Sequence, residues 1–124
     1  MPKVYHSIEE IKMAFFLPNI LDRLGVSLCS FLNLSDDNYS ISKSKDNPNT
    51  GFVAVRKPMH CLYFPEESFK RIEEKIKMFY QREGFEIERE IFTGVKKDKE
   101  HYNIFLFETE DYYSVQIWNK SSVI

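Results

Sequence analysis

Carboxylates occur in adjacent pairs along the chain, and two carboxyl groups in one pocket are a common device for general acid and base catalysis. The pairs are Glu9-Glu10, Asp36-Asp37, Glu66-Glu67, Glu73-Glu74 and Glu110-Asp111. A catalytic acid needs a raised pKa, which requires a buried site. Most of these pairs fall at expected helix starts or turns, where water solvates them. The sequence therefore predicts no catalytic residue and leans against an enzyme, without deciding the question.

Histidines and cysteines are too few and too scattered to predict a metal centre or a nucleophile. A metal site needs three or four converging ligands, and His6, His60 and His101 lie far apart in the chain. His60 and Cys61 are neighbours, but on a strand adjacent side chains point to opposite faces. We predict two buried thiols, at Cys29 and Cys61, and no metal or cofactor.

Lysines and aromatic residues near the C-terminus suggest an alternative function, which is nucleic-acid binding. Lys96, Lys97 and Lys99 are candidates for phosphate contacts, and Tyr102 and Trp118 could stack on bases. If the strands align, a second basic group lies nearby, made of Lys43, Lys45, Arg56 and Lys57. The formal charge of the chain is −2 and its pI is about 5.9, however, so nucleic acid is not the favoured partner. A solvated turn is the plainer interpretation of these lysines.

Aromatic residues make up 15% of the 124 residues, which is a heavy load for a core of this size. Exposed tyrosine and tryptophan are frequent anchors in protein interfaces. We therefore expect a partner-binding surface, and its candidate residues are Tyr102, Tyr112, Trp118, Asp36 and Asp37. Burial under a helix, or the codon bias of an AT-rich genome, would also account for the aromatic residues.

The elements that must position these residues begin with a helix over 7–24, capped by Ser7, bent near Pro18 and ended by Gly25. An ambiguous apolar run, 26–34, is interpreted as a buried strand, although leucine spacing also fits a helix. Strands are predicted over 39–42 and 52–55, with an exposed, mobile loop over 43–51 between them. Residues 59–64 are expected to be extended.

The second half of the chain begins with a helix over 66–82, started by Pro65 and ended by Gly84. Charged pairs four residues apart, such as Glu67 and Arg71, support this helix. Strands are predicted over 85–91, 102–107 and 112–118, with a charged turn over 95–100 and a short tail over 121–124. The strand over 102–107 is apolar on both faces, which is typical of a central strand covered on both sides.

The order of elements predicts an α+β fold in a single domain, 1–124, with an antiparallel sheet of about six or seven strands and two main helices. The last strand is expected at a sheet edge, where it could pair with a second copy in a homodimer. The start of the chain resembles no signal peptide, and no apolar run is long enough for a membrane span. We therefore expect a cytoplasmic protein.

Three functions stay open. The favoured one is a small, acidic protein-binding or inhibitor module, of the immunity-protein type that neutralises a toxin or of the viral type that antagonises a host factor. An acidic surface suits a basic target such as a nuclease. The second is a small-ligand-binding domain or an enzyme, with a pocket between the sheet and the helices. The third is nucleic-acid binding through the lysine-bearing turns.

Overall fold

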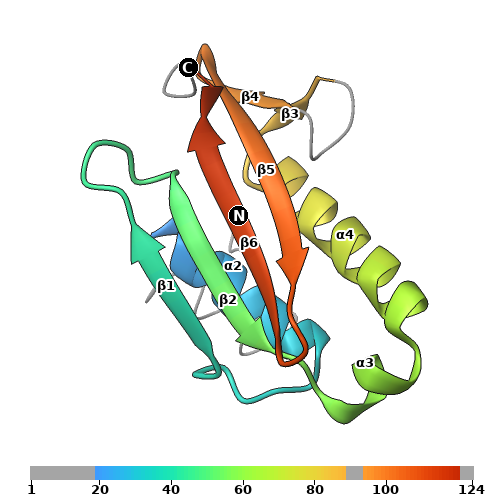
Figure 1. Cartoon of the computed structure of the whole chain (residues 1–124). Helices are drawn as coiled ribbons and strands as arrows, with labels where there is room; N and C mark the ends of the chain where they lie inside the picture. The colour runs from blue at the N-terminus through green and yellow to red at the C-terminus, as the bar shows by residue number, and fades with distance from the viewer. Residues whose placement is uncertain (1–18, 89–93, 121–124) are drawn as a thin grey trace, which may run out of the picture.

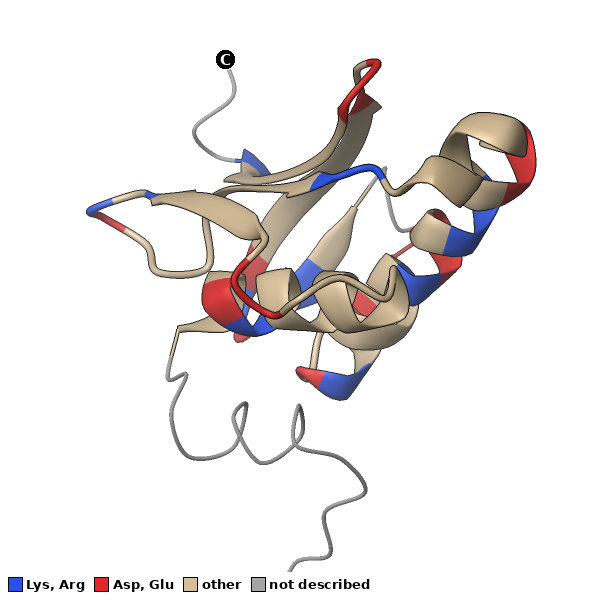
Figure 2. Cartoon of the chain, turned by 90° about the horizontal axis from the view of Figure 1, so that it is seen from below, with Lys and Arg blue, Asp and Glu red and all other residues tan. Residues whose placement is uncertain are grey.

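A computed structural model describes residues 19–88 and 94–120 of the chain. The architecture is one antiparallel sheet of six strands in the order β1-β2-β6-β5-β4-β3, with the two long helices packed on one face (Figures 1 and 2). The strands are β1 (Tyr39–Lys43), β2 (Gly51–Arg56), β3 (Glu86–Ile87), β4 (Val95–Lys97), β5 (Glu100–Glu108) and β6 (Tyr112–Asn119). The α+β fold with an antiparallel sheet is thus confirmed.

Helix α2 (Ile20–Phe31) corrects two predictions at once. Residues 26–34 are not a strand, because the helix continues through Gly25 and buries Leu24, Leu28 and Leu32 on the sheet. Asn19 caps its start, since Oδ1 accepts a hydrogen bond of 2.8 Å from the Leu21 amide. The part of the predicted helix over 7–18 lies outside the described residues.

Helix α2 ends instead at Phe31, and the residue that stops it is Asn33, which adopts a left-handed backbone with φ of 59°. The Leu34 amide donates to the Cys29 carbonyl and the Asn33 amide donates to the Ser30 carbonyl, which is the Schellman arrangement. Asparagine tolerates this conformation better than most side chains. The helix stop is therefore eight residues beyond the glycine that the sequence suggested.

Helix α4 (Pro65–Arg82) confirms the predicted helix and its stop signal. Gly84 takes a φ of 92°, while the Phe85 and Gly84 amides donate to the Tyr80 and Gln81 carbonyls. This is the same Schellman arrangement that ends α2. The apolar stripe of α4 packs Ile72, Ile76 and Phe79 into the core between the sheet and α2.

A short helix, α3 (Met59–Tyr63), stands where the sequence predicted extended chain. Pro58 and Pro65 bracket the segment, and proline is compatible with both an extended approach and a helix start. The Cys61 side chain anchors α3 in the core, since it is only 2% exposed. Figure 1 shows α3 leading directly into α4 at one end of the sheet.

The sheet departs from prediction in three further places. Strand β3 has only two residues, and the predicted continuation over 89–91 lies outside the described residues. Val95–Lys97 forms strand β4, so the charged turn shrinks to Asp98 and Lys99. Strand β5 is interior in the sheet, but the described elements cover one face of it; on the other face Phe105 is half-buried and Phe107 is half exposed.

The last strand, β6, is not an edge strand, because it pairs with β2 on one side and β5 on the other. Its backbone hydrogen-bonding groups are used inside the sheet. A homodimer formed by edge pairing of this strand is therefore excluded in this fold. The edges of the described sheet are β1 and β3.

Candidate functional site

The residues predicted to bind a partner do not form one surface. Tyr102 is 2% exposed, and its ring packs against Phe85 in the core, with ring centroids 5.7 Å apart. This burial takes the Tyr102 ring out of reach of a partner or a base. Tyr112 and Trp118 are exposed, but they stand at opposite ends of β6. Asp36 and Asp37 are exposed in the turn between α2 and β1.

A polar cleft of about 690 Å³ lies at the end of the sheet where the 44–50 loop meets the β4–β5 hairpin. It brings together three predicted residues, Lys97, Tyr102 and Trp118. The Tyr102 hydroxyl accepts hydrogen bonds from the side-chain amides of Asn47, at 3.0 Å, and Asn49, at 3.3 Å. The tyrosine therefore serves to fasten the 44–50 loop to the sheet.

The three lysines predicted to contact phosphate have different surroundings. Lys97 Nζ donates to the Glu83 carbonyl at 3.0 Å and lies 5.0 Å from the centre of the Phe85 ring. A cation at this position complements the negative end of helix α4. Lys96 is half-buried and Lys99 is exposed in the hairpin turn. Arg56 and Lys57 stand at the other end of β2 from the 44–50 loop, so the predicted basic groups do not merge.

Among the described residues, the most exposed large apolar side chains are on and after α3, and the sequence did not predict them as a surface. Met59, Leu62, Tyr63 and Phe64 are 68%, 53%, 71% and 64% exposed. We name these four residues the α3 patch. Such a cluster is uncommon on a monomer, because exposed large apolar side chains usually stand singly. The signal in the sequence is an apolar run between two prolines that does not alternate as a half-buried strand would.

Acidic residues lie in two segments near the α3 patch. Glu66 and Glu67 begin helix α4, Glu108 ends strand β5, and Glu110 and Asp111 belong to the turn between β5 and β6. Figure 1 shows the β5–β6 turn and the start of α4 at the same end of the sheet as α3. Glu66 and Glu108 line one depression of about 300 Å³, together with Pro65, Phe69, Lys70 and Glu73.

These flanking charges leave a surplus of negative charge. Lys57 is engaged by Glu108, with Nζ and Oε2 2.8 Å apart. Among the described residues, no ion pair involves Glu66, Glu67, Glu110 or Asp111. The basic side chains nearby are Arg56 and Lys70, both exposed. The α3 patch is thus an apolar surface with a mainly acidic border.

Both cysteines are buried and neither forms a disulfide, which confirms the prediction of two buried thiols. The hydroxyl of Tyr113 is buried beside the side chains of Cys61 and Ser68. Burial, followed by the neighbouring Cys61 thiol, raises the pKa of Tyr113, while Ser68 acts in the opposite direction. In the described part of the chain, no group of three or more potential ligands is placed to hold a metal ion.

Comparison with known protein families, curated proteins and solved structures finds no match for this chain. The fold is that of an α+β protein, and its described part exposes the α3 patch, an apolar surface with a mainly acidic border. Across the helices that the structure describes, none has the length and apolar character needed to cross a membrane.

Proposed function

We propose that this protein is a protein-binding module whose interface is the α3 patch and whose partner is a basic protein. The observation that carries the proposal is the exposure of four large apolar side chains within six consecutive residues, 59–64. Burying such side chains against a partner removes apolar surface from water and is the main favourable term in association. Tyrosine and phenylalanine also bind with little loss of side-chain entropy.

The acidic border of the α3 patch supports a partner with positive charge. Charges around an apolar centre act chiefly on the association rate and on partner choice, and they favour the opposite sign. The start of α4 and the β5–β6 turn, which carry these carboxylates, lie at the same end of the sheet as α3, so they would attract a basic surface that approaches the patch. An inhibitor that covers the active face of a basic enzyme, such as a nuclease, is the finer form of this proposal.

The test is a comparison of two variants of the full chain against a lysate of its source cells. Leu62→Ser with Tyr63→Ser removes two residues of the patch, whereas Phe107→Ser removes an aromatic residue that is half exposed on the sheet face. Proteins retained by the unaltered chain and by Phe107→Ser, but lost with the double variant, are the partners. If the double variant retains the same proteins as the unaltered chain, the proposal is wrong.

A purified partner then allows the affinity to be measured. Truncating Tyr63 or Phe64 to alanine should weaken binding about tenfold or more, as expected for a residue at the centre of an interface. Glu66→Lys with Glu67→Lys should slow association, and this effect should fade as salt is added. Equal binding by all variants would place the interface elsewhere.

A further inference from the structure

A groove of about 520 Å³ lies between the end of α2, the inner side of α3 and one face of α4. The walls combine apolar groups from Phe31, Leu32 and Met78 with polar groups from three elements. Its size falls in the range of pockets for small organic ligands. None of the α3 patch residues lines the groove, so it is a separate site.

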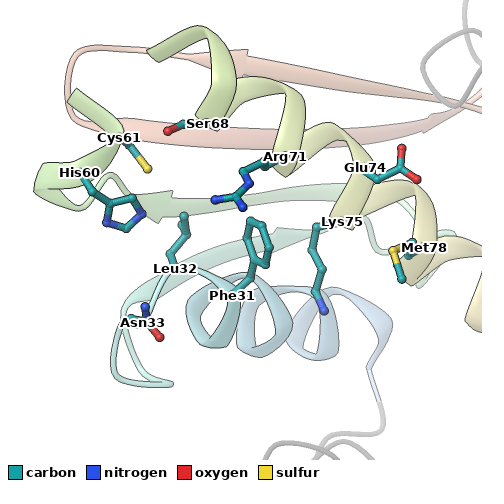
Figure 3. Close-up of a pocket in the computed structure, with 10 residues that line it drawn as sticks. All are labelled: Phe31, Leu32, Asn33, His60, Cys61, Ser68, Arg71, Glu74, Lys75 and Met78. Carbon is teal, nitrogen blue, oxygen red and sulfur yellow. The ribbon is translucent and has the colours of Figure 1, made fainter. Parts of the chain in front are cut away.

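Two lysine or arginine side chains and one carboxylate line this groove, so it has a positive balance although the chain as a whole has a formal charge of −2. His60, Arg71 and Lys75 line it, and the carboxylate that also lines it is Glu74. Figure 3 shows Arg71 and His60 pointing toward one another across the groove and Lys75, on the other side of the Phe31 ring, pointing toward helix α2, while the Glu74 carboxylate turns away. The centre of the groove is therefore faced by the Arg71 guanidinium and the His60 imidazole, and the Lys75 ammonium lies beside Phe31.

These cationic groups are not committed to other partners. In the part of the chain that the structure describes, Arg71, His60 and Lys75 make no ion pair and no side-chain hydrogen bond. Glu67, which the sequence pairs with Arg71, forms no bridge to it. Lys75 lies 6.0 Å from the centre of the Phe31 ring, a cation–π distance that leaves its three N–H donors available.

The floor of the groove is polar. Cys61 and Ser68 line the groove, and both interact with the buried Tyr113 hydroxyl behind it. The polar atoms in the floor thus lie behind the cationic wall.

We infer that this groove binds a small organic anion, a phosphate ester or carboxylate with an apolar group attached. A guanidinium forms two parallel hydrogen bonds with such an anion, which makes Arg71 the principal contact and His60 and Lys75 supporting ones. The apolar part of the ligand lies on Phe31, Leu32 and Met78. The head group is oriented toward the Ser68 end of the groove.

The experiment titrates the full chain with phenyl phosphate, benzoate and inorganic phosphate, followed by two-dimensional amide NMR. Phenyl phosphate or benzoate should shift amides of residues 31–33, 60–61 and 68–75. At least one of them should bind more tightly than inorganic phosphate, because the apolar wall contributes. The stronger of the two assigns the head group as phosphate or carboxylate.

Matched variants on one helix separate a built site from general attraction to positive charge. Arg71→Gln should weaken binding about tenfold, and Arg71→Lys should weaken it less, because charge persists without the paired hydrogen bonds. Arg82→Gln removes the same charge from the exposed end of α4 outside the groove and should leave the affinity unchanged. The same spectra report whether each variant is folded.

Two results would overturn the inference. One is a set of shifts spread over basic residues across the surface, with Arg71→Gln and Arg82→Gln equally affected. The other is the absence of shifts with either organic probe at concentrations up to about 10 mM, well above the dissociation constant of even a weak site. Neither result depends on a protein partner, so the outcome is independent of the function proposed for the α3 patch.

Discussion

The ring of Tyr39 occupies the space that a Cβ at Gly25 would fill, so strand β1 packs directly on the backbone of helix α2. The Tyr39 hydroxyl then reaches along the helix and donates to Asp22 Oδ1 at 2.9 Å. Glycine in the middle of a helix costs about 1 kcal/mol relative to alanine. Here the absent side chain is what allows the edge of the sheet to approach the helix.

Gly25→Ala should destabilise the protein in spite of the better helix propensity of alanine. The added methyl group overlaps the Tyr39 ring, and overpacking of this kind costs about 1–3 kcal/mol. Urea unfolding monitored by circular dichroism gives the change in the free energy of unfolding. Ser30→Ala, at an exposed position of the same helix, is the control and should be neutral or slightly stabilising. A gain in stability from Gly25→Ala would show that the ring moves away freely.

Alkaline pH should lower the stability of the fold, because three of its tyrosines have a raised pKa in the folded state. Burial and the hydrogen bond to Asp22 raise the pKa of Tyr39 to about 12, and burial also raises the pKa of Tyr80 and of Tyr113. A group with a raised pKa in the folded state contributes stability that is complete below its ordinary pKa of about 10. That contribution is lost as the pH rises from about 10 toward the raised value.

Tyr39→Phe tests the part of this pH dependence that belongs to one residue. At neutral pH the variant should lose about 1 kcal/mol, because the hydrogen bond to Asp22 is gone. Above pH 10 its stability should fall less steeply than that of the unaltered protein, since one titrating group is absent. Urea midpoints measured between pH 7 and about pH 11 give both slopes. Identical slopes would mean that Tyr39 titrates normally in the folded chain.

Lys97→Met should be destabilising, whereas Lys99→Met should not. Lys97 closes the end of helix α4 through the Glu83 carbonyl and also contacts the Phe85 ring, and methionine keeps only the apolar stem. The loss should be about 1–2 kcal/mol in urea unfolding. Lys99 is exposed and its side chain makes no hydrogen bond in the described structure. If neither variant changes the free energy of unfolding, the Lys97 side chain is not held by helix α4, and it becomes a candidate for phosphate contact again.

Lys99→Gly should stabilise the β4–β5 hairpin. Asp98 and Lys99 both have positive φ, 52° and 70°, as in a two-residue type I′ turn. Glycine removes the steric cost of the second residue at the expense of a more flexible unfolded chain, for a net gain of about 0.5 kcal/mol. The midpoint of thermal unfolding should rise accordingly. Lys97→Gly, within strand β4, should have the opposite effect.

Local signals in the sequence predicted an element correctly where the signals for its start, its buried face and its end all lie within one short segment. Helix α4 has proline and acids at its start, an apolar stripe, and Gly84 at its end, so its limits were predicted to within one residue. Strands β1, β2, β5 and β6 were recognised from alternation and the turns between them. The burial of Cys29 and Cys61 followed from their isolation and apolar surroundings.

Tertiary contacts decided the rest. Gly25 resembles a helix stop in the sequence, but the ring of a residue 14 positions later packs on it, and the stop moves to Asn33. Strand β6 is last in the chain yet central in the sheet, because β2 pairs with its free side. Tyr102 is drawn into the core by Phe85 and by the two asparagines of the 44–50 loop.

The candidate surfaces likewise depend on the assembled fold. Whether the apolar run after Pro58 is buried or exposed is decided by what packs over it, and in the described structure the outer side of α3 meets solvent. The cationic groove gathers side chains from positions 31 to 78 through the packing of three helices. The sequence by itself determined the fold class and the self-contained elements, because these depend on local period and capping. Only the tertiary structure decided which side chains meet, because that depends on contacts between distant segments.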